Sequence, residues 1–337
     1  MSQIFKMKIK VLHHKEYFGQ RIPTFKSIDL ELFVNHIKSF GYDVDLLDFE
    51  SLQFEINNSD SSLYVCGSHQ NLDVKKYLDD VLSLPVFNNA VIPDRDLIKC
   101  HENKGYQGLY AKQKDLPFIE QSYYIEPRNI SERKVLKLVN GAGSGGVTLV
   151  SKTEELNSFI RKSILSRVGI KRVAYYLRAF LKSKLKRTNI NELALEYYKV
   201  KEPYVLQNFV DELTCDYKVL VFNKKCFVLK RNTRTNDFRA SGSGKFEFVK
   251  PEEGLLNFAL EFRTKLATPY VSIDIIKTKE GYKCIEFQCA HFGPYTQINA
   301  QYYYEKVENQ WLENKNNTVL EELLAESLVL FIENEKC

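Results

Sequence analysis

Two neighbouring runs of alternating apolar and polar residues, 270–278 and 282–288, constrain this chain more than any other stretch. They flank residues 279–281, which suit a three-residue hairpin loop with its glycine in a left-handed conformation. Antiparallel partners keep a constant index sum, so this loop places Asp274 opposite Glu286. We therefore expect a β-hairpin that carries two carboxylates side by side.

The period-2 pattern gives this hairpin an apolar face and a polar face. The apolar face comprises Val271, Ile273, Ile275, Ile285 and Phe287, and the polar face comprises Ser272, Asp274, Glu286 and Gln288. Like charges that lie directly opposite on a sheet repel, so the two carboxylates call for a compensating cation. Oxygen ligands without a nearby histidine favour Mg²⁺. The alternative is a solvated hairpin whose outer face is acidic.

Composition and length limit the class of protein. The chain has 337 residues, of which 44% are hydrophobic and 27% charged, which is enough for about two or three globular domains. It begins without the apolar core of a signal peptide and contains no long apolar run. Seven cysteines without CxxC spacing indicate neither a zinc site nor a disulfide framework. These features predict a cytoplasmic protein.

Positive charge is concentrated in one segment. Residues 156–191 contain ten Lys or Arg and no Asp or Glu, whereas the whole chain has a net charge of only +5. The rest of the chain therefore has a net charge of −5, which argues against nucleic acid as a general partner.

The same segment has helical periodicity. Apolar residues recur at Val173, Leu177, Phe180, Leu181 and Leu185. This spacing predicts a basic amphipathic helix within 160–187. Three uses stay open: contact with an anionic membrane at its inner face, a grip on an acidic or lipid-phosphate substrate, or a helix that covers the core with a solvated basic face.

The N-terminal residues, 1–94, alternate between strand-like and helix-like segments. Strands are expected at 8–12, 44–49, 63–66 and 90–92, and helices at 28–40 and 74–84. This order predicts a small parallel sheet with helices on its faces. The polar tripeptide 68–70 follows the third strand, at the carboxyl edge where open α/β sheets bind ligands.

A glycine-rich loop at 141–146 is the second informative stretch. We expect one helix over 94–114, a strand at 123–126, and then a strand, the loop and another strand over 135–150. Glycines let backbone N–H groups approach phosphate oxygens, and Lys137 in the first strand can neutralise them. The arrangement predicts a flap over a nucleotide; the alternative is a flexible hairpin turn with a surface lysine.

The second half of the chain adds strands at 204–210, 217–222 and 226–230, and helices at 251–265 and 318–332. Between these lies an arginine-rich segment that contains Arg231 and Arg239 and a Gly/Ser loop at 241–244. Arginines next to such a loop suit phosphate and carboxylate groups.

In their order and spacing, these pieces resemble the ATP-grasp superfamily over about residues 103–288. The resemblance assigns ATP to Lys104, Lys137, Gly143, Ser144, Gly145, Gly146, Gln207, Asn208, Phe209 and Val210. It assigns the metal site to Asp274, Glu286 and Gln288. This site would hold two Mg²⁺ ions, or Mn²⁺ in place of Mg²⁺. The NDFR motif at 236–239 is similar to the GDFR-like element of the branch that contains the glutamate ligase of ribosomal protein.

Two residues depart from the pattern of that branch. Gln288 stands where the branch usually has Asn, and Asn208 stands where an acidic residue is common. Gln288 affects where the second metal ion binds, and Asn208 affects the selectivity for a purine base.

The resemblance also implies the architecture. It predicts an α/β ATP-grasp fold with a preceding β/α domain at 1–94, a small lobe at 95–215 that includes the basic insertion 156–191, and a large lobe at 216–337. Arg231 would contact the transferred phosphoryl group and the acyl oxygen. Arg239 and the 241–244 loop would hold the acceptor or the carboxylate, and Cys289, His291 and Tyr295 are candidates to line that pocket.

The implied activity is an ATP-dependent ligation of a carboxylate to an amine or a thiol through an acylphosphate. The substrates would be small molecules, with a surface-glycan precursor as one target class. The alternatives are a small-molecule phosphotransferase of the same superfamily and a non-catalytic nucleotide-binding protein.

Overall fold

A computed structural model describes residues 7–57, 62–141, 146–167, 170–184, 196–197, 199–234 and 237–336. The contacts among these residues divide them into two compact units. Unit 1 takes its residues from 1–119 and 210–337, and unit 2 takes its residues from 120–141 and 146–209. The domain boundaries expected after residues 94 and 215 stay a prediction.

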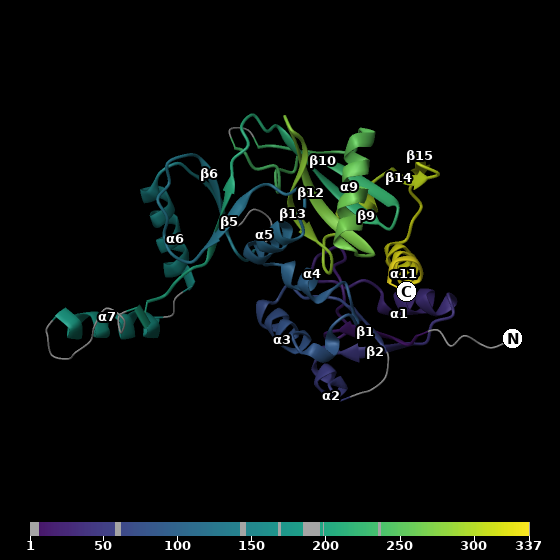
Figure 1. Cartoon of the computed structure of the whole chain (residues 1–337), viewed down its shortest axis with the longest axis horizontal. Helices are drawn as coiled ribbons and strands as arrows, with labels where there is room; N and C mark the ends of the chain where they lie inside the picture. Colours follow the sequence, from purple (N-terminus) through teal and green to yellow (C-terminus); the bar gives the residue numbers. More distant parts are fainter. Residues whose placement is uncertain are drawn as a thin grey trace. The chain divides into compact units, whose positions relative to one another are not determined.

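The N-terminal part of unit 1 is a parallel sheet with helices around it, which confirms the prediction (Figure 1). Its strands are β1 (Ile9–His13), β2 (Val44–Asp48), β3 (Leu63–Cys66) and β4 (Val91–Ile92), in the order β2-β1-β3-β4. Its helices are α1 (Leu30–Ser39), η1 (Phe49–Ser51), α2 (Leu52–Glu55), α3 (Leu72–Leu82) and η2 (Pro85–Phe87). The central strand β1 is buried on both faces at Val11 and Leu12, as expected when helices cover a parallel sheet on both sides.

The single helix expected over 94–114 is wrong, because the chain forms two helices there. These are α4 (Arg95–Cys100) and α5 (Lys104–Gln113). Glu102 has φ +51°, outside the helical region, and the Asn103 side chain accepts a hydrogen bond from the Tyr106 N–H at 3.0 Å. Asn103 therefore acts as the N-cap of α5. The break makes Lys104 the first residue of a new helix.

A seven-stranded antiparallel sheet forms the other part of unit 1. Its strands run in the order β13 (Gly281–Gln288), β12 (Tyr270–Thr278), β9 (Cys215–Phe222), β10 (Lys225–Asn232), β14 (Tyr302–Val307) and β15 (Gln310–Lys315), with β11 (Phe246–Glu247) paired to β10. The helical elements of this part are α9 (Glu253–Leu266), α10 (Tyr295–Asn299), α11 (Leu320–Phe331) and the π-helical turn η3 (Ile332–Lys336). Apolar residues of α9 pack on one face of β9, β12 and β13. The opposite face carries polar side chains in one part and apolar ones, such as Leu220 and Phe222, in another.

The expected hairpin register is wrong at the loop and right at the carboxylates. Thr278 pairs with Gly281, so the loop has two residues rather than three, although Gly281 has the positive φ that was predicted, +118°. A β-bulge then shifts the register and restores the pairing of Asp274 with Glu286. Ile285 lies in the bulge and is only partly buried, whereas the other residues of the predicted apolar face are buried.

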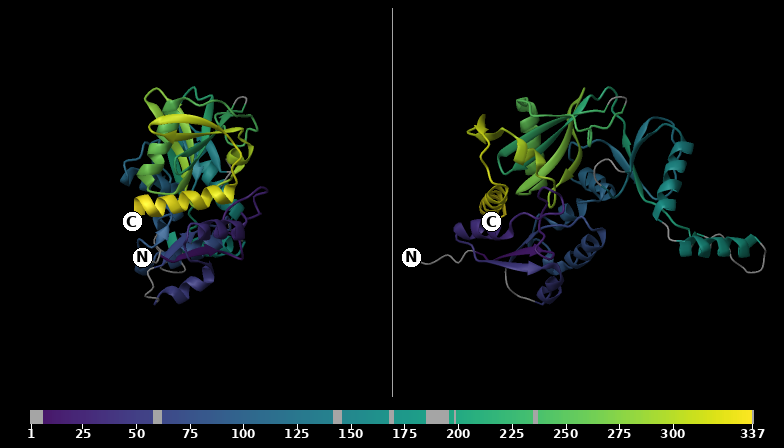
Figure 2. Two further views of the ribbon diagram at one scale, coloured as in Figure 1. Left: turned by 90° about the vertical axis from the view of Figure 1, so that its right-hand side faces the viewer. Right: turned by 180° about the vertical axis from the view of Figure 1, so that it is seen from behind.

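Helix α11 joins the two sheets of unit 1 through one apolar core. Figure 2 shows α11, in yellow, between the seven-stranded sheet and the N-terminal sheet. Leu328 of α11 lies in the same cluster of buried residues as Phe33 of α1 and Phe222 of β9. Burial of such side chains is the main favourable term in folding, so the N-terminal sheet and the large sheet stabilise each other.

Unit 2 contains a smaller antiparallel sheet and helices. Its strands are β5 (Gln121–Tyr124), β8 (Tyr204–Asn208), β6 (Lys134–Leu138) and β7 (Val147–Val150), in the order β5-β8-β6-β7. The two strands predicted on either side of the glycine-rich segment are present as β6 and β7. The helices are α6 (Thr153–Arg167) and α7 (Ile170–Lys184). In the described part of the chain, no helix is long and apolar enough to cross a bilayer.

Replacing Leu328 should test the shared core of unit 1. Leu328 is fully buried, so Leu328→Ala should lower the free energy of unfolding by about 2–5 kcal/mol. Leu312→Ala on β15 is the matched control, because Leu312 is 45% exposed and its loss should cost less than about 0.5 kcal/mol. Urea denaturation followed by circular dichroism measures both. Equal losses in the two variants would contradict the shared core.

Candidate functional site

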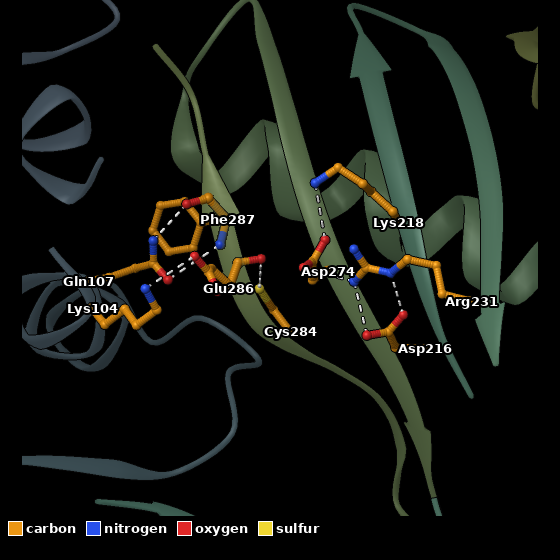
Figure 3. A network of polar contacts seen from close by, with 9 residues as sticks. All are labelled: Lys104, Gln107, Asp216, Lys218, Arg231, Asp274, Cys284, Glu286 and Phe287. Carbon is orange, nitrogen blue, oxygen red and sulfur yellow. Dashed lines mark hydrogen bonds and ion pairs between the residues drawn. The ribbon is translucent and has the colours of Figure 1, made fainter. Parts of the chain in front are cut away.

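Polar side chains of four neighbouring strands gather on the face of the large sheet opposite α9 (Figure 3). Asp274 on β12 is the register partner of both Glu286 on β13 and Lys218 on β9. Asp216 on β9 is the register partner of Arg231 on β10. Register partners in an antiparallel pair point to the same face, and Asp216 and Lys218 are two residues apart on β9. These five side chains therefore share one face of the sheet, with the like charges Asp274 and Glu286 side by side. We call them the charged row.

Arg231 connects two carboxylates of the charged row. Its Nε lies 2.6 Å from Oδ1 of Asp216 and its Nη2 lies 2.9 Å from Oδ2 of Asp216, which is a bidentate contact. The same Nη2 lies 2.8 Å from Oδ2 of Asp274. Lys218 places its Nζ 3.3 Å from the other oxygen of Asp274. Asp216 therefore fixes the plane of the guanidinium that Asp274 also contacts.

These contacts determine the protonation states of the charged row. Burial opposes ionisation of Asp274, but the charges of Arg231 and Lys218 prevail and lower its pKa to about 2. Burial raises the pKa of Asp216 more than Arg231 lowers it. The bidentate contact with a guanidinium that stays protonated nevertheless keeps Asp216 ionised at neutral pH.

Glu286 faces the start of helix α5. Lys104, the first residue of α5, places its Nζ 3.8 Å from Oε1 of Glu286. Gln107 holds α5 against β13, because its Nε2 donates to the carbonyl of Phe287 at 2.6 Å and its Oε1 accepts from the Phe287 N–H at 3.3 Å. Lys104 and Gln107 are both buried polar residues. The helix break at Asn103 thus brings a lysine to the charged row.

The protein itself supplies the cations that the carboxylate pair requires. Arg231 and Lys218 lie beside Asp274, and Lys104 lies beside Glu286, so the repulsion between the two carboxylates is already offset without the metal ion that the sequence predicts. Among the described residues there is no group of three or more His, Cys, Asp or Glu side chains suited to a metal. Two carboxylates and the amide of Gln288 still fit Mg²⁺, which usually takes one or two carboxylates and completes its shell with water and phosphate. The metal assignment therefore stays a prediction.

The arginine-rich segment folds back on itself. Arg239 makes a bidentate contact with Asp237, with Nε 3.0 Å from Oδ1 and Nη2 2.7 Å from Oδ2. Nη2 of Arg234 donates to the carbonyls of Ser241 and Gly242 at 3.2 and 3.1 Å and so closes the 241–244 loop. The acceptor role assigned to Arg239 stays a prediction.

Of the nucleotide residues predicted in unit 2, Lys137, Gln207 and Asn208 lie on strands of its sheet. Lys137 on β6 is buried, and Gly146 at the end of the glycine loop has φ +76°, which favours glycine. Gly143, Ser144 and Gly145 lie outside the described residues. Val210 follows β8 and belongs to unit 1.

The predicted hinge occupies the end of β8. Gln207 donates through Nε2 to Oε1 of Gln121 at 3.0 Å. Asn208 accepts from Lys134 at 2.7 Å and donates to the carboxylate of Glu120 at 3.0 Å. An acidic side chain therefore lies next to Asn208, although the hinge position itself carries an amide.

Two buried histidines lie near the carboxyl edge of the N-terminal sheet. Tyr17 Oη and His291 Nε2 are 2.8 Å apart, and Ser68 Oγ and His101 Nδ1 are 2.9 Å apart. Burial lowers the pKa of His291 to about 4 and lowers that of His101 as well, so both imidazoles are neutral at pH 7.

The other two candidates for the acceptor pocket differ in exposure. Cys289 is fully buried, and burial raises the pKa of its thiol, so it is not a reactive thiolate. Tyr295 is exposed and packs edge-to-face against Phe246 with ring centroids 5.5 Å apart.

Lys218, Asp216 and Gln107 are not among the site residues predicted from the sequence. The spacing offered a signal for the first two, because Asp216 and Lys218 are two apart in a strand next to the hairpin and so share its polar face. Gln107 follows Lys104 by three residues and therefore lies on the same side of α5. Its contact with the backbone of Phe287 has no sequence signal.

Comparisons with known proteins identify the fold. No protein-family model matches the chain. A segment of 83 residues is 28% identical to a glutamate racemase of Borreliella burgdorferi, but it covers only 24% of this chain and 31% of the racemase. D-cycloserine synthetase DcsG superposes with a TM-score of 0.52 over 96% of this chain and 99% of its own, at 9% identity.

Two further solved structures are similar over the same length. The ATP-grasp ligase PsnB with a minimal precursor has a TM-score of 0.49 and 11% identity, over 96% of this chain and 99% of its own. The D-alanine–D-alanine ligase of Bacillus anthracis complexed with ATP has a TM-score of 0.48 and 12% identity, over 97% and 99%. The similarity to DcsG, at 9% identity, shows the fold and not the activity.

The chain is an α/β protein: it has a parallel β/α domain, an antiparallel sheet with paired carboxylates on one face, and a smaller antiparallel unit. The chain has the ATP-grasp fold, and this confirms the fold predicted from the sequence resemblance.

The low pKa of Asp274 predicts how stability depends on pH. Because the folded-state pKa lies below the ordinary value of 3.8, the ionised carboxylate stabilises the fold above pH 4 and this contribution disappears as pH falls toward 2. Asp274→Asn should therefore lose about 2 kcal/mol of unfolding free energy at pH 6 and much less at pH 2.5. Urea titrations across this range measure it, with the exposed Asp80→Asn as control. A difference between Asp274→Asn and wild type that does not change with pH would contradict the ion pairing.

Proposed function

We propose that this protein is an ATP-dependent ligase that joins a carboxylate to an amine or a thiol through an acylphosphate. The observation that carries the proposal is the charged row, together with Lys104, on one face of an ATP-grasp sheet. Phosphoryl transfer requires mainly positioning and neutralisation of charge, and ionised carboxylates beside fixed cations suit both tasks.

Each residue of the site has a role in the proposal. Asp274, Glu286 and Gln288 would hold Mg²⁺, which neutralises the ATP phosphates. Lys104 and Lys137 would bind phosphate oxygens, and the segment 207–210 would contact the adenine through its backbone. Arg231, oriented by Asp216, would contact the transferred phosphoryl group and the acyl oxygen.

The proposed contacts to the acceptor substrate are less specific than those to ATP and Mg²⁺. Arg239 and the 241–244 loop are the proposed contacts for the carboxylate or the acceptor, since guanidinium groups bind carboxylates in a bidentate manner. We propose a small-molecule carboxylate and an amine, with a surface-glycan precursor as one target class, in a cytoplasmic protein. The solved structures that resemble the chain include a D-cycloserine synthetase, which supports ligation of a small-molecule substrate.

Replacing one metal carboxylate is the direct test of the activity. Glu286→Ala should abolish ATP-dependent turnover, because it removes about 3 kcal/mol or more of charge stabilisation, a loss of at least about 100-fold in rate. Gln288→Asn is the matched variant, since it keeps the amide oxygen and should retain turnover. A phosphate-release screen over pairs of amino acids and carboxylates measures both.

The products of that screen separate the alternatives. Free phosphate and a ligated product support the ligase, whereas ADP with a stable phosphorylated acceptor would replace it with a phosphotransferase. Wild-type turnover by Glu286→Ala would contradict the metal assignment.

Replacing Asp216 tests whether it orients Arg231. Asp216→Asn keeps the size of the side chain but removes the charge that fixes the guanidinium plane. We expect kcat to fall about 10-fold or more while the KM for ATP changes little, because Arg231 acts in the transition state. Steady-state kinetics at saturating Mg²⁺ measures this. An increase in KM with no change in kcat would indicate a structural role only.

A further inference from the structure

Helix α7 exposes an apolar stripe, which we define as Val173, Leu177, Phe180 and Leu181. These residues have relative exposures of 36%, 51%, 36% and 57%. They recur at i, i+4, i+7 and i+8 and therefore line one side of the helix. Folded proteins rarely expose contiguous apolar surface without a binding role.

The apolar stripe lies outside the core of unit 2. Among the described residues, the buried cluster of this unit consists of side chains from its sheet and from α6, and it includes no residue of α7. Figure 1 shows α6 lying along the sheet while α7 stands away from it. The sequence left three uses open for the basic helix. The structure does not support one of them, in which the helix covers the core.

The stripe lies within the most basic segment of the chain. Residues 156–191 contain ten Lys or Arg and no acidic residue. Arg161 and Lys162 on α6 and Arg178 on α7 are exposed to solvent. The composition of this segment therefore favours a negatively charged partner for the apolar stripe.

We propose that α7 binds the surface of an anionic lipid bilayer, with the apolar stripe inserted at the boundary between headgroups and acyl chains. An amphipathic helix binds such a surface through buried apolar area and through attraction between Lys or Arg and anionic lipids, and α7 offers both. A polyanion such as nucleic acid would pair with the Lys and Arg side chains but would leave the apolar stripe exposed to water. A second copy of the chain would bring two basic segments together, which like-charge repulsion opposes.

Vesicle binding tests this proposal without any need for ligase activity, so its failure is independent of the proposed function. The full chain should cosediment with vesicles of phosphatidylcholine and phosphatidylglycerol at low salt. Binding should weaken as salt rises and should be much lower with phosphatidylcholine alone.

Matched variants separate insertion from charge. Leu177→Gln with Leu181→Gln removes two apolar side chains without a change of charge, and glutamine is a good helix former. We expect this pair to weaken binding to the anionic vesicles by about tenfold or more. Tyr175→Gln is the control, because Tyr175 is 61% exposed on the same helix but projects away from the stripe. It should bind like wild type.

Three results would overturn the proposal. The first is the absence of binding to anionic vesicles by the wild-type chain. The second is equal binding by wild type and the Leu177→Gln, Leu181→Gln pair, which would indicate a purely electrostatic polyanion site. The third is a dimer, seen by light scattering, that this pair dissociates while vesicles stay unbound, which would mean that a second copy covers the stripe.

Discussion

The pairing of two carboxylates on adjacent strands is the constraint on which the site depends. Asp274 and Glu286 face each other across β12 and β13, and a sheet tolerates this only with positive charge close by. Arg231 and Lys218 supply it from the neighbouring strands, and Lys104 supplies it from the first turn of α5. The sheet, the helix break and the buried Asp216 all serve to hold these cations in place.

Much of this arrangement could be predicted from the sequence, because strand alternation and helix spacing are local properties. The predicted pairing of Asp274 with Glu286 is correct, although the predicted loop length and the predicted continuous register are not. The loop is one residue shorter and a bulge shifts the register, and these two differences offset each other. A β-bulge is hard to recognise in an alternating sequence pattern, because its extra residue only reverses which face the following residues occupy. The break at Asn103 was missed because its neighbours also suit a helix, whereas the cap depends on one side-chain hydrogen bond.

Contacts between elements that are distant in sequence were beyond prediction. Gln107 reaches the backbone of Phe287, and Asp216 contacts Arg231 from another strand. Periodicity alone shows which face a residue occupies but not which element lies opposite. For α7 it predicted the amphipathic pattern correctly and left open what the apolar side contacts. The structure narrows that choice, since the stripe is exposed and lies outside the core of unit 2.

The central claim is that the paired carboxylates bind a divalent ion together with the nucleotide. Titration with Mn²⁺, followed by electron paramagnetic resonance in the presence of a non-hydrolysable ATP analogue, tests it most directly. We expect nucleotide-dependent binding of Mn²⁺ by the wild-type chain and loss of that binding when Asp274 and Glu286 are both replaced by amides. Undiminished nucleotide-dependent binding by that double variant would contradict the account.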